Sequence, residues 1–179
     1  MKLRKILLIC LICVLLLTVS LLCAVFAYMF KQTDTVEMEF VPAHVACEVV
    51  ENFDGVNKSS ITVKNTGNID AYLRVRMVTY WINADNEIVP VASQMPAYTV
   101  HSDWLPLGDH TYCYVYPVAP GNTTPANLLA TQMTLETSEE GYRQVVAVFA
   151  EAIQANPDNA VEEAWIVKVS DDGTLLSGS

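Results

Sequence analysis

Residues able to do acid–base or metal chemistry are sparse in this chain. The histidines are His44, His101 and His110, and no His-Glu-x-x-His sequence occurs, the arrangement that places two zinc ligands and a base on one helix. His101 with Asp103, and Asp109 with His110, could supply metal ligands from one loop; the alternative is that all four are solvated loop residues. The sequence therefore assigns no catalytic residue, metal or cofactor, and we expect no enzyme.

Five aspartates lie near predicted turns. Aspartate is favoured in turns because its side chain hydrogen-bonds the local backbone. Loop carboxylates also suit calcium, which takes about six to eight oxygen ligands, but no EF-hand spacing is present. Turn formation is the main interpretation and calcium binding the alternative for Asp54, Asp70, Asp85, Asp109 and Asp158.

Two cysteines follow the apolar N-terminus, Cys47 and Cys113. Both lie on predicted strands, and an oxidising exterior would permit a disulfide between them. Sequence does not show whether their Cα atoms approach closely enough, so buried free thiols are the other interpretation. A catalytic cysteine would need a nearby histidine, to which the spacing does not point.

Aromatic residues form one further candidate site. Alternation along a predicted strand puts three tyrosines on one side of it. Together with the tryptophans they could form a platform for a sugar, or they could pack in the core and at its rim. The residues are Tyr112, Tyr114, Tyr116, Trp81, Trp104 and Trp165.

The first 30 residues form an export or membrane segment. Lys2, Arg4 and Lys5 precede residues 6–30, which contain no charged side chain. About 20 apolar residues cross a bilayer as a helix, and a basic start before an apolar core also marks a signal peptide. Small residues precede a predicted signal-peptidase cut between Ala27 and Tyr28; a retained single-span anchor is the alternative. Either interpretation places residue 31 onward outside the cytoplasm.

Charge restricts the partners of the exported part. Removing residues 1–27 would change the formal net charge from −10 to −13. Such a surface repels phosphates and anionic lipid heads, so we expect no nucleic-acid partner and membrane contact only through residues 6–30.

Beyond residue 30 the pattern predicts strands separated by turns. In residues 71–81 apolar side chains alternate with Arg74 and Arg76, which predicts one buried and one solvated face. Residues 143–155 are apolar on both faces, as in a central strand. A short helix is expected from Asn156-Pro157-Asp158 to about Trp165. We therefore expect an all-β, antiparallel β-sandwich with one short helix at 31–170, after the hydrophobic helix at 1–30 and before a polar tail at 171–179.

Several segments, taken in their order along the chain, carry a resemblance to known secreted proteins. They are 24–30, 33–36 with Phe40, 47–49, 53–55, 64–74, Trp104, 112–118, 120–121, 152–155 and 164–165. The order is similar to that of proteins with a SipW-type signal peptide, the broad TasA and camelysin-like group of Gram-positive surface proteins. The resemblance implies a jelly-roll-like sandwich, a dedicated signal peptidase and a role in cell-surface or biofilm-matrix fibres. Camelysin-like proteins are described as metallopeptidases, for which this chain lacks the usual helical motif.

One segment is a candidate for assembly. Residues 35–41 alternate, with Val36, Met38 and Phe40 on one face. Once the signal is removed, this strand is tethered on one side only and could pair with a neighbouring subunit by strand addition. Pairing within its own domain is the alternative.

These observations favour a non-enzymatic secreted or cell-surface structural protein, a fibre or biofilm-matrix subunit or an accessory to one. Its expected partners are a signal peptidase and either copies of itself or other surface proteins. A surface module that binds calcium or a glycan is the alternative. An extracellular hydrolase is the least favoured class, because no nucleophile elbow is present.

N-terminal sequencing of the protein from culture medium and from membranes tests the export segment. We expect the secreted protein to begin at Tyr28, because the small residues lie directly before that position. A chain that begins at Met1 and stays in the membrane fraction would contradict cleavage and establish an anchor.

Overall fold

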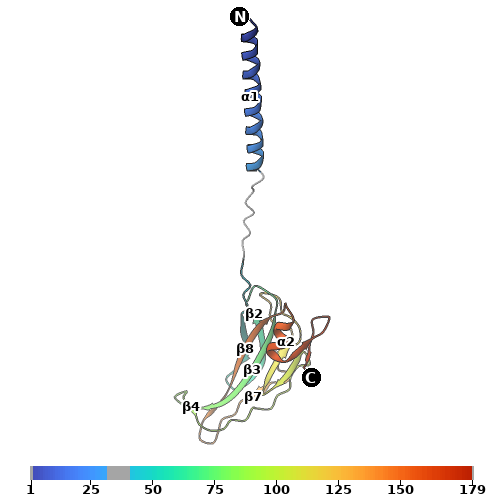
Figure 1. Ribbon diagram of the computed structural model, residues 1–179. Helices are drawn as coiled ribbons and strands as arrows, with labels where there is room; N and C mark the ends of the chain where they lie inside the picture. Colours follow the sequence, from blue (N-terminus) through green and yellow to red (C-terminus); the bar gives the residue numbers. More distant parts are fainter. Residues whose placement is uncertain (1, 32–40, 179) are drawn as a thin grey trace. The chain divides into compact units, whose positions relative to one another are not determined.

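The computed structural model describes residues 2–31 and 41–178, in two compact units, Met1–Val41 and Pro42–Ser179. The first unit contains α1 (Lys2–Lys31), drawn in blue in Figure 1. Its stretch Arg4–Tyr28 is long and apolar enough to cross a membrane, with a mean hydropathy of 3.2, as expected for a signal sequence or an anchor. The predicted assembly strand with Val36, Met38 and Phe40 lies outside the described residues.

The second unit is mostly β-structure with antiparallel sheets and one short helix. In chain order its elements are β1 (Cys47–Phe53), β2 (Asn57–Asn65), β3 (Ala71–Ile82), β4 (Ile88–Val89), β5 (Trp104–Gly108), β6 (Thr111–Tyr114), β7 (Met133–Thr134), β8 (Arg143–Gln154), α2 (Asn159–Trp165), β9 (Val167–Val169) and β10 (Leu175–Ser177). The predicted strand at 71–81 and the helix after Asp158 are confirmed.

The strands form three antiparallel sheets. The first has the order β1-β2-β7, and β9 pairs with β10. In the remaining sheet β8 pairs with β3 along its whole length, from Ala71↔Gln154 to Ile82↔Arg143, and Figure 1 shows these two long strands side by side. A strand has only two edges, so β6 and β4 share the other edge of β3, and β5 follows β6.

The main core lies between the β1-β2-β7 sheet and the sheet of β3. Ile61 and Val63 of β2 pack in one cluster with Leu73 and Val75 of β3, and all four are fully buried. They occupy alternate positions because successive side chains of a strand point to opposite faces. Burial of each such side chain contributes about 1.5–3 kcal/mol.

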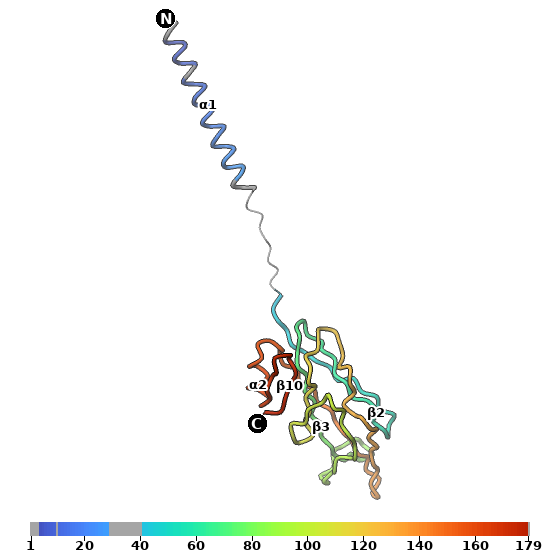
Figure 2. Tube along the Cα trace, turned by 90° about the vertical axis from the view of Figure 1, so that its right-hand side faces the viewer, coloured from blue at the N-terminus to red at the C-terminus, as the bar shows by residue number. Residues whose placement is uncertain are grey.

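A second cluster covers part of the other face of β3. Tyr72 and Cys113 pack there against Val161 and Trp165 of α2 and against Leu175 of β10. Figure 2 shows α2 and β10 together on one side of the unit. The prediction of a solvated second face is therefore wrong for this half of the sheet, because α2 and the β9–β10 hairpin fold over it.

A cation fixes the helix on that face. The Arg74 guanidinium lies over the Trp165 ring, 4.8 Å from its centroid, and forms an ion pair with Glu151 of β8. Cation–π contacts of this kind add about 0.5–2 kcal/mol. Arg76, two residues further along β3, is exposed, as the sequence predicted for both arginines.

Two further expectations need correction. β8 matches the predicted strand in extent but is an edge strand, because among the described residues only β3 pairs along its length, and the Phe149 side chain is 57% exposed. On its second apolar face Ile153 packs on the second cluster, Val145 and Ala147 are partly buried, and Phe149 is exposed. The predicted polar tail at 171–179 instead contains β10, whose Leu175 is buried against that cluster.

The turn at residues 65–68 holds the start of the second unit in place. The N–H groups of Thr66 and Gly67 donate to the Ala46 carbonyl at 2.9 and 3.2 Å, and the Asn68 side chain accepts from the His44 N–H at 2.6 Å. A Cβ atom on Gly67 would lie 2.4 Å from the His44 carbonyl oxygen. Glycine is therefore required by close backbone approach, not merely by the turn.

Asn65 makes the most extensive set of hydrogen bonds in this region. Its side chain is fully buried and donates to the carbonyls of Ile69 at 2.9 Å and Val118 at 2.7 Å, while its oxygen accepts from the Gly67 N–H at 2.9 Å. Its backbone N–H and C=O bond residues 121–122 at 2.8 and 2.9 Å. One residue thus joins β2, the following turn and two later segments.

We expect Asn65→Ala to lower the free energy of unfolding by about 2–4 kcal/mol, because it removes the three hydrogen bonds of a fully buried side chain. Urea unfolding followed by circular dichroism measures the change. Asn122→Ala is the matched control, since its side chain is exposed; we expect a change within about 0.5 kcal/mol. Equal stability of the two variants would contradict the role of Asn65.

Candidate functional site

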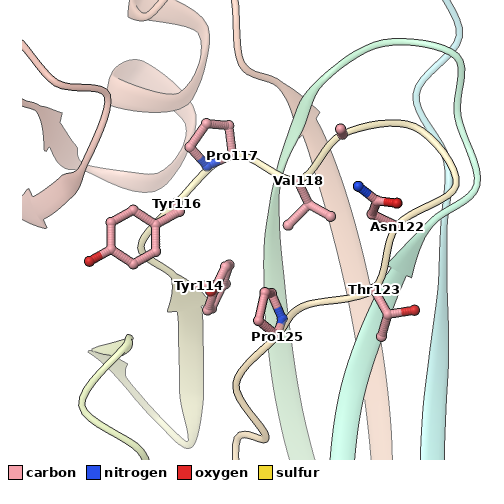
Figure 3. A pocket seen from close by; sticks show the side chains of 8 residues that line it. Tyr114, Tyr116, Pro117, Val118, Asn122, Thr123 and Pro125 are labelled. Atoms are coloured by element: carbon pink, nitrogen blue, oxygen red, sulfur yellow. The ribbon is translucent and has the colours of Figure 1, made fainter.

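A surface pocket of about 600 Å³ lies where the chain leaves β6 and turns back. Tyr114, Tyr116 and Pro117 line one side, and Asn122, Thr123 and Pro125 line the other, as Figure 3 shows. Val118 and Ala119 complete the lining. The volume falls within the range of about 300–1,000 Å³ typical of small-ligand sites.

Aromatic stacking fixes the tyrosine side of the pocket. The Trp104 and Tyr114 rings have centroids 5.4 Å apart, and the Trp104 indole N–H donates to the Ala126 carbonyl at 3.1 Å. Tyr116 meets Tyr114 edge-on, with centroids 5.7 Å apart and planes at 71°. Tyr114 is 4% exposed and Tyr116 45%, so Tyr116 presents most of the accessible ring surface.

Backbone pairing fixes the opposite side. Thr123 forms a β-bridge with Lys64, and the buried Thr124 hydroxyl accepts from the Val63 N–H at 3.1 Å. On the tyrosine side, Val118 forms a bridge with Ala71. Because both sides are tied to β2 and β3, the pocket is formed before any ligand arrives.

The pocket offers neutral polar groups. None of its eight lining residues is charged. Burial raises the pKa of Tyr114, and the nearby Asp103 raises it further, so this hydroxyl stays protonated at neutral pH. Within residues 41–178 the side chains of Tyr116, Asn122 and Thr123 have no hydrogen-bond partner in the protein. The arrangement can bind through hydrogen bonds and apolar contact, without acid–base chemistry.

A second hollow, of about 340 Å³, lies between the β1–β2 hairpin and the start of β8. Lys58 forms an ion pair with Glu51 at 2.6 Å there, and its ammonium lies 5.6 Å from the centroid of the Phe53 ring. Arg143 and its neighbours on β8 form the facing side. This hollow therefore lies between two strands that are each at the edge of a sheet.

The two His–Asp pairs considered as metal ligands do not lie together in one site. His101 Nδ1 lies 3.7 Å from Asp103 Oδ2, whereas His110 Nδ1 is 2.8 Å from the Tyr98 hydroxyl. Tyr98 also bonds the Tyr112 hydroxyl at 2.6 Å. Among the residues that the structure describes, no group of three or more His, Cys, Asp or Glu side chains is placed to hold a metal ion.

Asp54 stabilises the turn that the sequence predicted at this position. Its carboxylate accepts from the N–H groups of Val56 at 2.9 Å and Asn57 at 2.6 Å, across the β1–β2 hairpin whose Gly55 has a φ of 100°. These bonds, those from Asn57 above all, lower the pKa of Asp54 because they favour the ionised form.

Cys47 and Cys113 are both free, so the disulfide left open by the sequence is not formed. Cys47 packs against the main core and Cys113 within the second cluster, on the other face of the sheet of β3. Burial raises the pKa of the Cys113 thiol to about 12. Burial also raises the pKa of Cys47, and the negative charge of Glu151 adds to this effect.

The three tyrosines and three tryptophans of the predicted aromatic platform do not lie together on one exposed surface. Trp81, Trp104 and Trp165 are all buried, which agrees with the packing interpretation. Asn122 and Thr123 were not singled out from the sequence. The available signal was the turn at Pro120-Gly121, since a reversal there brings residues 122–125 back beside the tyrosine strand.

The predicted cleavage position lies near the end of α1. Ala27 and Tyr28 are helical and precede its last residue, Lys31, by less than two turns. Comparison with protein-family models, with curated proteins and with solved structures finds no match for the chain.

Differential alkylation with peptide mapping tests the two thiol environments. At pH 8 we expect Cys47 to be labelled by iodoacetamide at least about tenfold faster than Cys113, because a pKa near 12 leaves only about one thiolate in ten thousand. Both thiols should react in concentrated guanidinium. Equal labelling of the folded protein would show that Cys113 is accessible and contradict this packing.

Proposed function

We propose that the chain is an exported, non-enzymatic structural protein whose β unit, a jelly-roll-like sandwich, assembles on the cell surface or in an extracellular matrix. The observation that carries the proposal is a pair of strand edges, one on β1 and one on β8, that are largely unpaired among the described residues. The order of segments shared with TasA and camelysin-like proteins supports the same class. The apolar α1 supports export, either as a signal peptide cut after Ala27 or as an anchor.

The two edges present free backbone groups. Among the described residues β1 pairs only with β2, and β8 pairs with β3 apart from a single bridge between Thr137 and Arg143. β1 and β8 also lie near one another, on either side of the second hollow. Rows of unpaired N–H and C=O groups are templates for pairing with another chain.

Exposed apolar side chains accompany these edges. Val50 and Phe53 of β1 are 45% and 46% exposed, and Val56 in the hairpin is also exposed. Phe149 of β8 lies opposite the exposed Arg76 in the sheet, on the face that α2 leaves open. Apolar surface grouped around a sheet edge favours a protein interface.

The occupant that we propose is residues 35–41 of a second copy. The segment from Tyr28 to Val41 precedes the compact unit that begins at Pro42. Seven residues of strand span about 23 Å, which equals the length of the seven-residue β1. The side chains of Val36, Met38 and Phe40 would share one face of such a strand and could fill the hollow beside β1.

Deletion of residues 28–41 from the processed chain tests the assembly. We expect the chain from Tyr28 to form concentration-dependent oligomers or filaments, and the chain from Pro42 to stay monomeric, because the pairing strand is lost. Size-exclusion chromatography with light scattering and negative-stain imaging measure the difference. Unchanged assembly after deletion, or monomers throughout, would contradict the proposal.

A point substitution tests the acceptor edge separately. Val50→Lys places a charge on the exposed edge strand, and we expect it to weaken assembly about tenfold or more. Val91→Lys is the matched control, because Val91 is 51% exposed in the loop after β4 and does not line the second hollow. Equal loss in both variants would show a general charge effect rather than an effect on β1.

A further inference from the structure

We propose that the pocket between Tyr116 and Asn122 binds one sugar ring of an uncharged glycan. The inference does not rest on the proposed assembly, because the pocket shares no lining residue with the hollow between β1 and β8. It uses an exposed aromatic ring, free polar side chains and a lining without charge.

The exposed ring supplies the apolar contact that a pyranose needs. A pyranose carries C–H groups on the faces of its ring, and it packs these groups on aromatic side chains. Tyr116 is 45% exposed and is held edge-on against Tyr114, which Trp104 supports from behind. The pyrrolidine rings of Pro117 and Pro125 extend this apolar surface on both sides (Figure 3). A supported ring loses little side-chain entropy on binding.

The pocket also holds polar side chains, those of Asn122 and Thr123, on the side opposite Tyr116 (Figure 3). The Asn122 carboxamide can donate and accept, and the Thr123 and Tyr116 hydroxyls can do either. In the part of the chain that the structure describes, none of the three is used by the protein itself. Sugar hydroxyls could replace their water without breaking any internal bond.

Charge selects the class of glycan. The eight lining residues are uncharged, and the protein around them has a net charge of −10. Phosphate- or carboxylate-bearing polymers would find no cation in the pocket and would be repelled by the surrounding field. An uncharged saccharide needs no cation in the pocket, and the surrounding negative charge does not repel it.

A proline-rich peptide is the competing occupant, since tyrosines and prolines also line polyproline-binding grooves. Such grooves use several exposed aromatic ridges. In this pocket Trp104 and Tyr114 are 2% and 4% exposed, so Tyr116 is the single accessible aromatic ring among its lining residues. One ring beside an amide and a hydroxyl fits one sugar ring better than an extended peptide.

The test uses the full chain in lauryldimethylamine oxide, a detergent without a sugar head group. Maltotriose, cellotriose, laminaritriose and triacetylchitotriose are titrated separately by calorimetry, and a decaproline peptide is titrated in parallel. We expect saturable binding of at least one trisaccharide with a Kd of about 1 mM. Tyr116→Ala and Asn122→Ala should each weaken it, the former at least about tenfold.

Tyr80→Ala is the control, because it removes a partly exposed tyrosine ring of β3 that lines neither the pocket nor the second hollow, and it should leave the affinity unchanged. Circular dichroism confirms that each variant is folded. The proposal is overturned if no trisaccharide binds saturably, if Tyr116→Ala and Asn122→Ala bind as the parent does, or if decaproline alone binds through Tyr116. Loss of assembly with retained sugar binding would overturn only the assembly proposal.

Discussion

The Asn65 carboxamide donates both of its N–H groups to main-chain carbonyls, those of Ile69 and Val118, in a place that water does not reach. A buried polar group left without a partner costs about 1–3 kcal/mol, so conformations that break these hydrogen bonds are disfavoured. The Val118 carbonyl belongs to a segment paired with β3, while the Asn65 backbone bonds residues 121–122. The register of the two sheets and the shape of the pocket therefore depend on the same side chain.

Local signals predicted the elements around this residue but not its function. The alternation in residues 71–81, the turn at Asp54-Gly55 and the helix after Asp158 all depend on neighbours in sequence, and all three are confirmed. Asn65 and Val118 are 53 positions apart, so their hydrogen bond leaves no local pattern. The turn at Pro120-Gly121 is a local signal for one side of the pocket, but the bridges of Thr123 with Lys64 and of Val118 with Ala71, which position both sides, join residues far apart in sequence.

The sequence-based predictions were wrong for elements whose apolar side chains are only partly buried by the rest of the chain. Apolar residues on both faces of β8 indicated a central strand, yet the second face is covered in part, with Ile153 packed on the second cluster and Phe149 exposed. Composition does not distinguish a face buried within the chain from one that is available to another chain. The segment at 171–179 was polar enough to predict a tail, but Leu175 is buried in the second cluster, β10 pairs with β9, and the Tyr72 hydroxyl donates to the Gly173 carbonyl at 2.8 Å.

The exposed edges and the acidic charge act together. Open strand edges favour unselective pairing, and charged side chains on or beside an edge oppose it. Glu48 and Glu51 lie on β1 and Glu151 on β8, all exposed, so two copies that approach edge to edge bring carboxylates together. A neighbour's residues 35–41 would present Val36, Met38 and Phe40 to the hollow and would carry Glu37 and Glu39 on the opposite face of the strand. Under the proposed function, the acids keep the folded unit from pairing at random, and the segment before Pro42 gives the edge one specific partner.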